Sequence, residues 1–98
     1  MDIDASRNGN TLTLSLAGRL DTITSPDLCD VLEESLKNVD RLILDFSQVI
    51  YLSSAGIRAI INANKMMSNR DGMVVRNVPS DVLGILKMSG IIDYLNVE

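Results

Sequence analysis

Hydrophobic and polar residues alternate with a period of two near the start of the chain. In residues 11–17, TLTLSLA, the leucines face one way and the threonine and serine side chains face the other, which is typical of a half-buried β-strand. The turn sequence Asn8-Gly9-Asn10 before it predicts that residues 1–6 form the partner strand of a hairpin. Two apolar runs, at residues 41–46 and 73–78, predict further strands, the first of them buried on both faces of its sheet.

Apolar positions switch to helical spacing in three other segments. The first helix is expected to have Ser25 as its N-cap and Pro26 at the first helical position. A second helix is predicted over residues 54–69, with Ser53 as its N-cap, and a third begins at residues 79–81 and stops at Gly90. The predicted buried stripes are Leu28, Val31, Leu32 and Leu36 in the first helix and Ile57, Ile60, Ile61 and Met67 in the second.

The predicted order of elements is β-β-α-β-α-β-α. Residues 47–52 are expected to connect a strand to the second helix, and residues 91–98 allow a short final strand. Strands that alternate with helices form parallel sheets with right-handed crossovers. We therefore expect one α/β domain over residues 1–98, with a mixed β-sheet of four to five strands and helices packed against it.

The composition argues against several classes of function. The chain has no histidine and one cysteine, so it lacks the usual general base and any Cys/His metal site. It contains no glycine-rich phosphate-binding loop. The formal net charge is −4 and the 9 basic residues are scattered, which disfavours nucleic acid as a partner. We expect neither an enzyme nor a bound metal.

The sequence also favours one cellular location. A lone thiol, Cys29, cannot form an intrachain disulfide, which fits a reducing compartment, and it is expected to pack within the first helix. No apolar run is long enough to span a bilayer, and the N-terminal residues are too acidic for a signal peptide. We expect a cytoplasmic protein that does not insert into membranes, with a monomer as the default state.

Two adjacent hydroxyls, Ser53 and Ser54, stand at the start of the second helix and precede the small residues Ala55 and Gly56. This is the carboxyl end of a parallel sheet, where open α/β folds usually carry their sites. A phosphoryl group there would add about −1.5 to −2 charge and oppose binding at a docking surface. A serine at a helix start is often only a cap, and small residues allow close packing, so a structural interpretation stands beside the functional one.

Three segments together resemble the STAS domain family and, more narrowly, the small bacterial anti-sigma factor antagonists. The segments are GRLDTITSPDL (18–28), LILDFSQVIYLSSAGIRAI (42–60) and LKMSGIIDYLNV (86–97). They combine G-x-L-D, a strand ending in D-[FL]-S, and S-[SA]-G at the start of a helix. The resemblance covers nearly the whole chain, in the expected order and spacing.

This resemblance implies a switch between binding partners. The unphosphorylated antagonist would bind an anti-sigma factor that is also a serine kinase, and the sigma factor would then be released. The kinase would use Mg-ATP to phosphorylate a serine at the start of the second helix, and a serine phosphatase would reverse this step. ATP and metal would belong to the kinase, so the resemblance implies no cofactor for this chain.

The resemblance also extends to single residues. Matched on Gly56, the family's phosphoacceptor falls on Ser54, whereas Ser53 replaces the usual aspartate and is kept as the alternative acceptor. Asp21 matches the acid of G-x-L-D, either at the partner surface or as a loop-capping carboxylate. Asp45 is expected to support the loop after its strand through hydrogen bonds. The predicted partner-binding residues are Asp21, Thr22, Thr24, Ser53, Ser54, Ala55, Gly56 and Arg58.

Two other functions compete with a binding switch. The chain could be a non-switching STAS subunit of a lipid-transport ABC complex or of a signalling scaffold, in which Ser54 is only a cap. A small hydrolase built on Ser54 would need an activating base, and without histidine only Asp21, Asp45 or a lysine could serve. Detectable turnover that is lost in Ser54→Ala would be required to favour the hydrolase.

Overall fold

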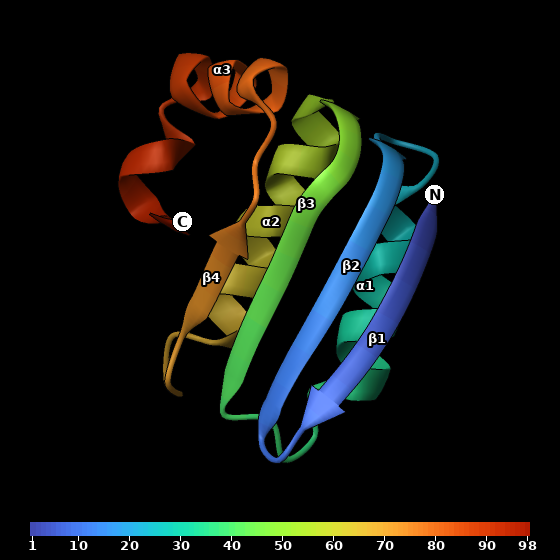
Figure 1. The fold of residues 1–98 in the computed structure, drawn as a ribbon, viewed down its shortest axis with the longest axis vertical. Helices are drawn as coiled ribbons and strands as arrows, with labels where there is room; N and C mark the ends of the chain where they lie inside the picture. The colour runs from blue at the N-terminus through green and yellow to red at the C-terminus, as the bar shows by residue number, and fades with distance from the viewer.

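The predicted strands assemble into one five-stranded sheet in the order β1-β2-β3-β4-β5, as the computed structural model of residues 1–98 shows (Figure 1). β1 (Asp2–Asn8) and β2 (Thr11–Leu20) are antiparallel. β3 (Arg41–Leu52), β4 (Met73–Arg76) and β5 (Asn96–Val97) follow as parallel neighbours. The predicted fold class, a mixed sheet with helices packed against it, is confirmed, and so is the short final strand.

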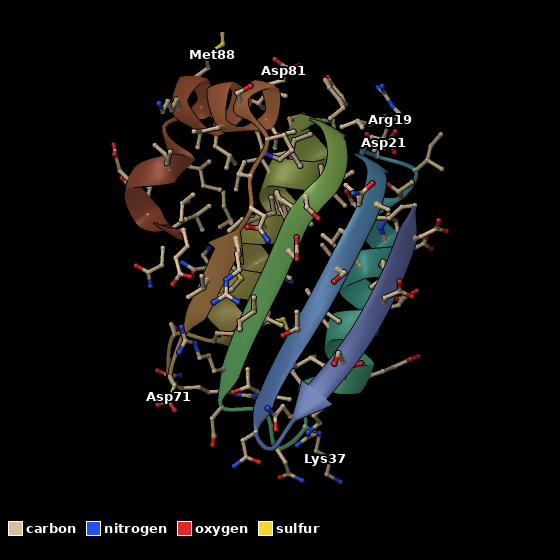
Figure 2. The ribbon with its side chains drawn as sticks, viewed as in Figure 1. Arg19, Asp21, Lys37, Asp71, Asp81 and Met88 are labelled. Carbon is tan, nitrogen blue, oxygen red and sulfur yellow. The ribbon has the colours of Figure 1, made fainter.

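Two helices cover one face of this sheet. α1 (Ser25–Ser35) joins β2 to β3 and α2 (Ser54–Met66) joins β3 to β4, and both lie behind the sheet in Figure 1. α3 (Ser80–Ser89) lies across the end of the sheet at which the parallel strands stop, and the 3-10 helix η1 (Ile91–Tyr94) leads from it to β5. Asp81 and Met88 of α3 lie at the same end of the molecule as Arg19 and Asp21 (Figure 2). None of these helices is long and apolar enough to cross a membrane.

The alternating leucines of β2 lie on the covered face. Leu12 pairs in register with Leu42, and Leu14 with Leu44, and all four are buried in one core with the apolar sides of α1 and α2. Ile43 points to the opposite face, where its register partners are Thr13 and Val74, and is also buried. Residues 42–44 are therefore buried in succession, as predicted, although both long helices lie on a single face.

β3 is longer than the sequence pattern predicts. Residues 47–52, expected to form a connection, continue the strand to Leu52. The register with β2 shifts where Phe46 and Ser47 together face Leu16, which is the geometry of a β-bulge. A second shift follows at Ile50, which lies between the register partners of Gly18 and Arg19. The two inserted residues break the period of two, so the pattern beyond Phe46 does not indicate a strand.

The ends of the other elements also differ from the prediction. Thr24, and not Ser25, is the N-cap residue of α1, so Ser25 is the first helical residue and Pro26 the second. β4 stops at Arg76 and does not reach residue 78, because Asn77 turns into a left-handed conformation with a φ of 59°. Gly90 ends α3 as predicted, with a φ of 79°.

The buried side of α2 is narrower than predicted. The helix ends at Met66, short of residue 69, and Ile61 is 36% exposed although the pattern placed it in the core. The residues buried along the helix are Gly56, Ala59, Ile60 and Ala63, three of which are small. Small side chains allow α2 to lie close to its neighbours, and Ile57 and Met66 pack against the core while remaining partly exposed.

Candidate functional site

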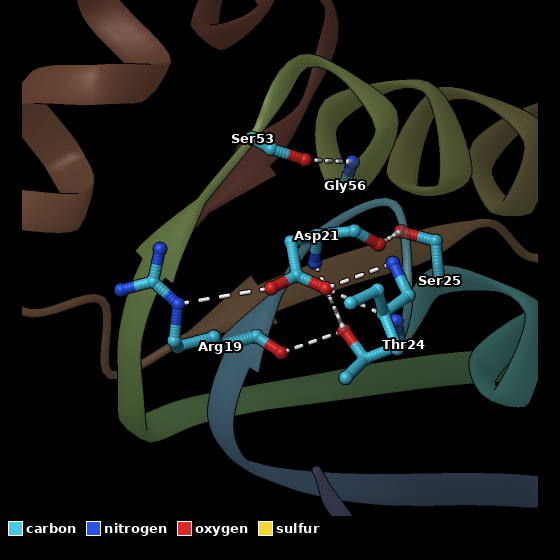
Figure 3. A network of polar contacts seen from close by, with 7 residues as sticks. Arg19, Asp21, Thr24, Ser25, Ser53 and Gly56 are labelled. Atoms are coloured by element: carbon cyan, nitrogen blue, oxygen red, sulfur yellow. Dashed lines mark hydrogen bonds and ion pairs between the residues drawn. The ribbon is translucent and has the colours of Figure 1, made fainter.

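The serine pair lies where β2, β3, α1 and α2 meet, at the carboxyl end of the parallel strands. The backbone N–H of Ser53 donates to the carbonyl oxygen of Leu20 at 3.0 Å, which ties the start of α2 to the end of β2. Figure 3 shows this junction, with Ser53 and Gly56 on one side and the connection between β2 and α1 on the other. The site is thus held by regular elements and not by a long loop.

The two serines have different roles in this junction. Ser53 is the N-cap of α2, as predicted: its extended backbone and its Oγ, which accepts a hydrogen bond from the Gly56 N–H at 3.2 Å, close the first turn. Ser54 is the first helical residue, is exposed, and its hydroxyl makes no hydrogen bond. The cap therefore occupies Ser53 and leaves the Ser54 hydroxyl free.

Gly56 is required by the close approach of α2 to β2. A Cβ at this position would overlap the carbonyl oxygen of Leu20 and also meet the Leu20 side chain. The family pattern predicted Gly56 as a partner-binding residue, but Gly56 is buried and does not face a partner in this structure. Its role in the site is to let the first turn of α2 reach the end of β2.

Asp21 organises the connection between β2 and α1. Its Oδ1 accepts hydrogen bonds from the backbone N–H of Ile23 at 3.0 Å and of Thr24 at 3.1 Å, and Arg19 approaches Oδ2 at 3.7 Å (Figure 3). The hydrogen bond from Thr24, foremost among these, holds the pKa of Asp21 below its ordinary value of 3.8. The carboxylate is therefore a loop cap in this state, which was one of the two predicted roles.

Thr24, expected at the partner surface, turns its hydroxyl inward. The Oγ1 donates to the carbonyl oxygen of Arg19 at 2.7 Å and accepts from the N–H of Asp21 at 2.9 Å. The hydroxyl of Ser25 donates to the Asp21 carbonyl oxygen. Together these bonds bring the chain round from β2 into α1 and fix the position of the exposed residues 22 and 23.

Three of the predicted residues line one groove between α1 and α2. Thr22, Ala55 and Arg58 face it together, and the α1 residues Ser25, Pro26 and Cys29 form its other wall. The groove is shallow and open, with a volume of about 460 Å³. Cys29 is half-buried and packs against the core, as expected for a lone thiol in a helix.

Several exposed residues at this end were not singled out from the sequence. Ile23 is 84% exposed and Ile50 is 66% exposed, which is high for large apolar side chains. The Arg19 guanidinium lies 4.4 Å from the centre of the Tyr51 ring, a cation–π contact. We define the serine face as the exposed residues of these elements: Thr22, Ile23, Ile50, Tyr51, Ser54 and Arg58.

Only indirect features of the sequence indicate that Ile23 and Ile50 are exposed. Ile23 interrupts a polar segment, DTITS, and Ile50 falls beyond the bulge, where the strand pattern is out of phase. Once β3 is extended to Leu52, Val49 and Leu52 are buried and Ile50 is exposed. Correct recognition of the bulge would have assigned Ile50 to the surface.

Asp45 lies away from the serine pair. Its Oδ1 accepts from the Ser47 N–H at 2.9 Å and its Oδ2 accepts from the Asn77 side chain at 3.3 Å. The hydrogen bond from Ser47 is the main cause of a pKa below the ordinary 3.8. Because residues 47–52 are strand, Asp45 supports the bulge of β3 and the segment after β4, and not the predicted loop.

The fold and this geometry define a STAS domain. Residues 3–96 match the family model described as Mlab, STAS domain, and the chain belongs to this family. It is 20% identical to the anti-sigma-B factor antagonist of Bacillus subtilis (strain 168) over 99 residues, which span 100% of this chain and 91% of that protein. The sequence resemblance to anti-sigma factor antagonists is thereby confirmed.

Two solved structures share the fold closely. A putative anti-sigma factor antagonist from Thermotoga maritima superposes with a TM-score of 0.82 at 15% identity, covering 97% of this chain and 84% of that one. The Bacillus cell fate determinant SpoIIAA in its phosphorylated form superposes with a TM-score of 0.66 at 14% identity, covering 99% and 91%. At such low identity these structures show that the fold is shared.

Proposed function

We propose that this chain is an anti-sigma factor antagonist whose binding to an anti-sigma factor serine kinase is switched off by phosphorylation of Ser54. The observation that carries the proposal is that the two serine hydroxyls have different hydrogen bonding. Ser53 caps the helix, whereas Ser54 is exposed with a hydroxyl that makes no hydrogen bond. A kinase can therefore reach and modify Ser54 without breaking the fold.

Phosphorylation changes the serine face electrostatically. The kinase transfers the γ-phosphoryl group of ATP to the Ser54 oxygen, the hydroxyl proton departs, and ADP is released. The product carries about −1.5 to −2 charge on the serine face, which also contains the exposed apolar side chains of Ile23 and Ile50. A partner that covers these side chains would have to desolvate the phosphate as well, which weakens binding.

Ser53 is the alternative acceptor and the less accessible one. Its Oγ already accepts the hydrogen bond from Gly56, and the residue is half-buried. A phosphate on Ser53 would displace this cap. The structure thus favours the register predicted from the family pattern, with Ser54 as the acceptor.

The free serine hydroxyl also bears on the alternative function. In a non-switching subunit of a transport complex or scaffold, Ser54 was expected to serve only as a cap. Ser53 performs that function here, so the alternative leaves the exposed Ser54 without a structural reason. The same serine face would still dock a partner in that case.

Incubation with Mg-ATP and a candidate kinase encoded beside this protein tests the proposal, with peptide mass spectrometry as the measurement. We expect one phosphate on Ser54 in the wild type and in Ser53→Ala, and none in Ser54→Ala. The phosphorylated protein should lose affinity for the kinase, and a serine phosphatase should restore it. Stable binding to a different complex, with no phosphate transferred, would favour the non-switching subunit.

A further inference from the structure

Arg58 is the one arginine near Ser54 whose guanidinium has no partner. Arg7 and Arg70 donate to backbone carbonyls, Arg76 pairs with Glu98, and Arg19 is held by Asp21 and Tyr51. Arg41, the other free arginine, begins β3 at the opposite end of the sheet. Arg58 forms no ion pair or cation–π contact although it is exposed beside the proposed switch.

The helix places Arg58 within reach of position 54. The two residues are four positions apart on α2, a spacing that brings side chains together on one side of a helix. Helical side chains lean toward the N-terminus, so the Arg58 side chain can reach the turn that begins at Ser54. An anion placed four residues before a cation is the favourable order for such a pair.

No other charged group competes for Arg58 in this region. The first turn of α2 contains no acidic residue. The α1 wall of the groove that Arg58 lines consists of Ser25, Pro26 and Cys29, all uncharged, and Thr22 faces it from the connection before α1. The nearby carboxylate of Asp21 is already bonded to backbone N–H groups and approached by Arg19.

From this arrangement we propose that Arg58 captures the phosphate on Ser54 within the same molecule. A guanidinium forms charge-assisted, bidentate bonds to phosphate oxygens, so the modified side chain would fold back along α2. Phosphorylation would then act twice: it adds charge to the serine face and removes a free cation from a partner's reach. This inference rests on the proposed function, since it requires phosphate on Ser54.

The phosphate's second pKa, measured by phosphorus NMR, tests the capture. The full chain is synthesised with phosphoserine at position 54, so the measurement does not depend on any kinase. A nearby cation favours the doubly charged phosphate, so the pKa should lie about 0.3 pH unit lower in the wild type than in Arg58→Gln. Arg41→Gln removes the same charge at the far end and should leave the pKa at the wild-type value.

Two results would overturn the capture. One is an Arg58→Gln protein whose phosphate titrates like the wild type. The other is an equal shift in Arg41→Gln, which would show an effect of net charge alone. Neither result would contradict phosphorylation of Ser54 by the kinase. Conversely, a kinase that fails to modify Ser54 would refute the proposed function, and the titration of the synthetic phosphoprotein would not change.

Discussion

At the scale of single residues, the Ser53 hydroxyl caps α2, whereas the neighbouring Ser54 hydroxyl is exposed and makes no hydrogen bond. Ser53→Ala removes the cap acceptor of Gly56 and should lower the free energy of unfolding by about 1 kcal/mol. Ser54→Ala removes an exposed hydroxyl without a partner and should change stability by less than about 0.5 kcal/mol. Urea unfolding of both variants measures the difference.

The reverse order of these stabilities would contradict the assignment of Ser53 as the cap. It would also remove the argument that Ser54 is free for modification. Because both variants replace the same side chain at adjacent positions, each serves as the control for the other.

Two glycines in helices provide a second comparison between residues. Gly56→Ala should cost about 1–3 kcal/mol or more, because the new Cβ overlaps the backbone carbonyl of Leu20, which cannot move freely. Gly84 lies in α3 with nothing within 4 Å of its missing Cβ, so Gly84→Ala should stabilise the protein by up to about 1 kcal/mol. Thermal unfolding of the two variants should therefore shift in opposite directions.

At the scale of elements, the connection between β2 and α1 depends on the ionised carboxylate of Asp21. Its pKa is lowered below 3.8 in the folded protein, so the interaction stabilises the fold above about pH 3.8. This stability is lost as the pH falls through the folded pKa. Asp21→Asn should be less stable than the wild type at pH 7, and the difference should shrink under acid conditions.

Urea unfolding of both proteins at a series of pH values measures this dependence. A difference that stays constant from neutral pH to below the folded pKa would show that ionisation of Asp21 does not hold the connection. Asp30→Asn is a matched control, because Asp30 is an exposed acid of α1 and forms no ion pair.

The elements also show how far the sequence could predict this fold. Periodicity of two in residues 11–17 and helical spacing after residues 25 and 54 placed the main elements correctly, since each pattern follows from local burial. The bulge at Ser47 and the cap at Thr24 were missed, because both depend on contacts with β2 or Asp21. Of the site, Ser53 and Ser54 could be predicted from local rules.

The neighbours of the serine pair could not be predicted in the same way. Arg19 and Tyr51 meet only after β2 and β3 pair in parallel, when the two residues become register partners. Gly56 could be chosen from the family pattern, but its contact with Leu20 depends on how α2 approaches the sheet. Such contacts are fixed by the tertiary fold and leave no local pattern.

At the scale of the whole molecule, the serine face combines features that differ from the rest of the surface. The chain is acidic overall, with a net charge of −4, yet this end presents the free guanidinium of Arg58 together with the exposed apolar side chains of Ile23 and Ile50. The apolar core of an interface with a polar rim is the usual arrangement for protein partners. Ile23 and Ile50 are therefore the expected anchors for a partner that covers this face, and a phosphate on Ser54 would add negative charge to the same face.

Ile23→Ser and Ile50→Ser should weaken binding of the unphosphorylated protein to the kinase by about tenfold each, because buried apolar anchors contribute more than about 1 kcal/mol to such interfaces. Calorimetry measures the affinities. Both side chains are largely exposed in the free protein, so the free energy of unfolding should change by less than about 0.5 kcal/mol.

Tyr94→Ser, on η1 and 80% exposed, is the control for loss of an exposed apolar side chain elsewhere and should bind as the wild type does. Equal losses in all three variants would point to a general effect of surface polarity, and unchanged binding in both isoleucine variants would place the interface on another face.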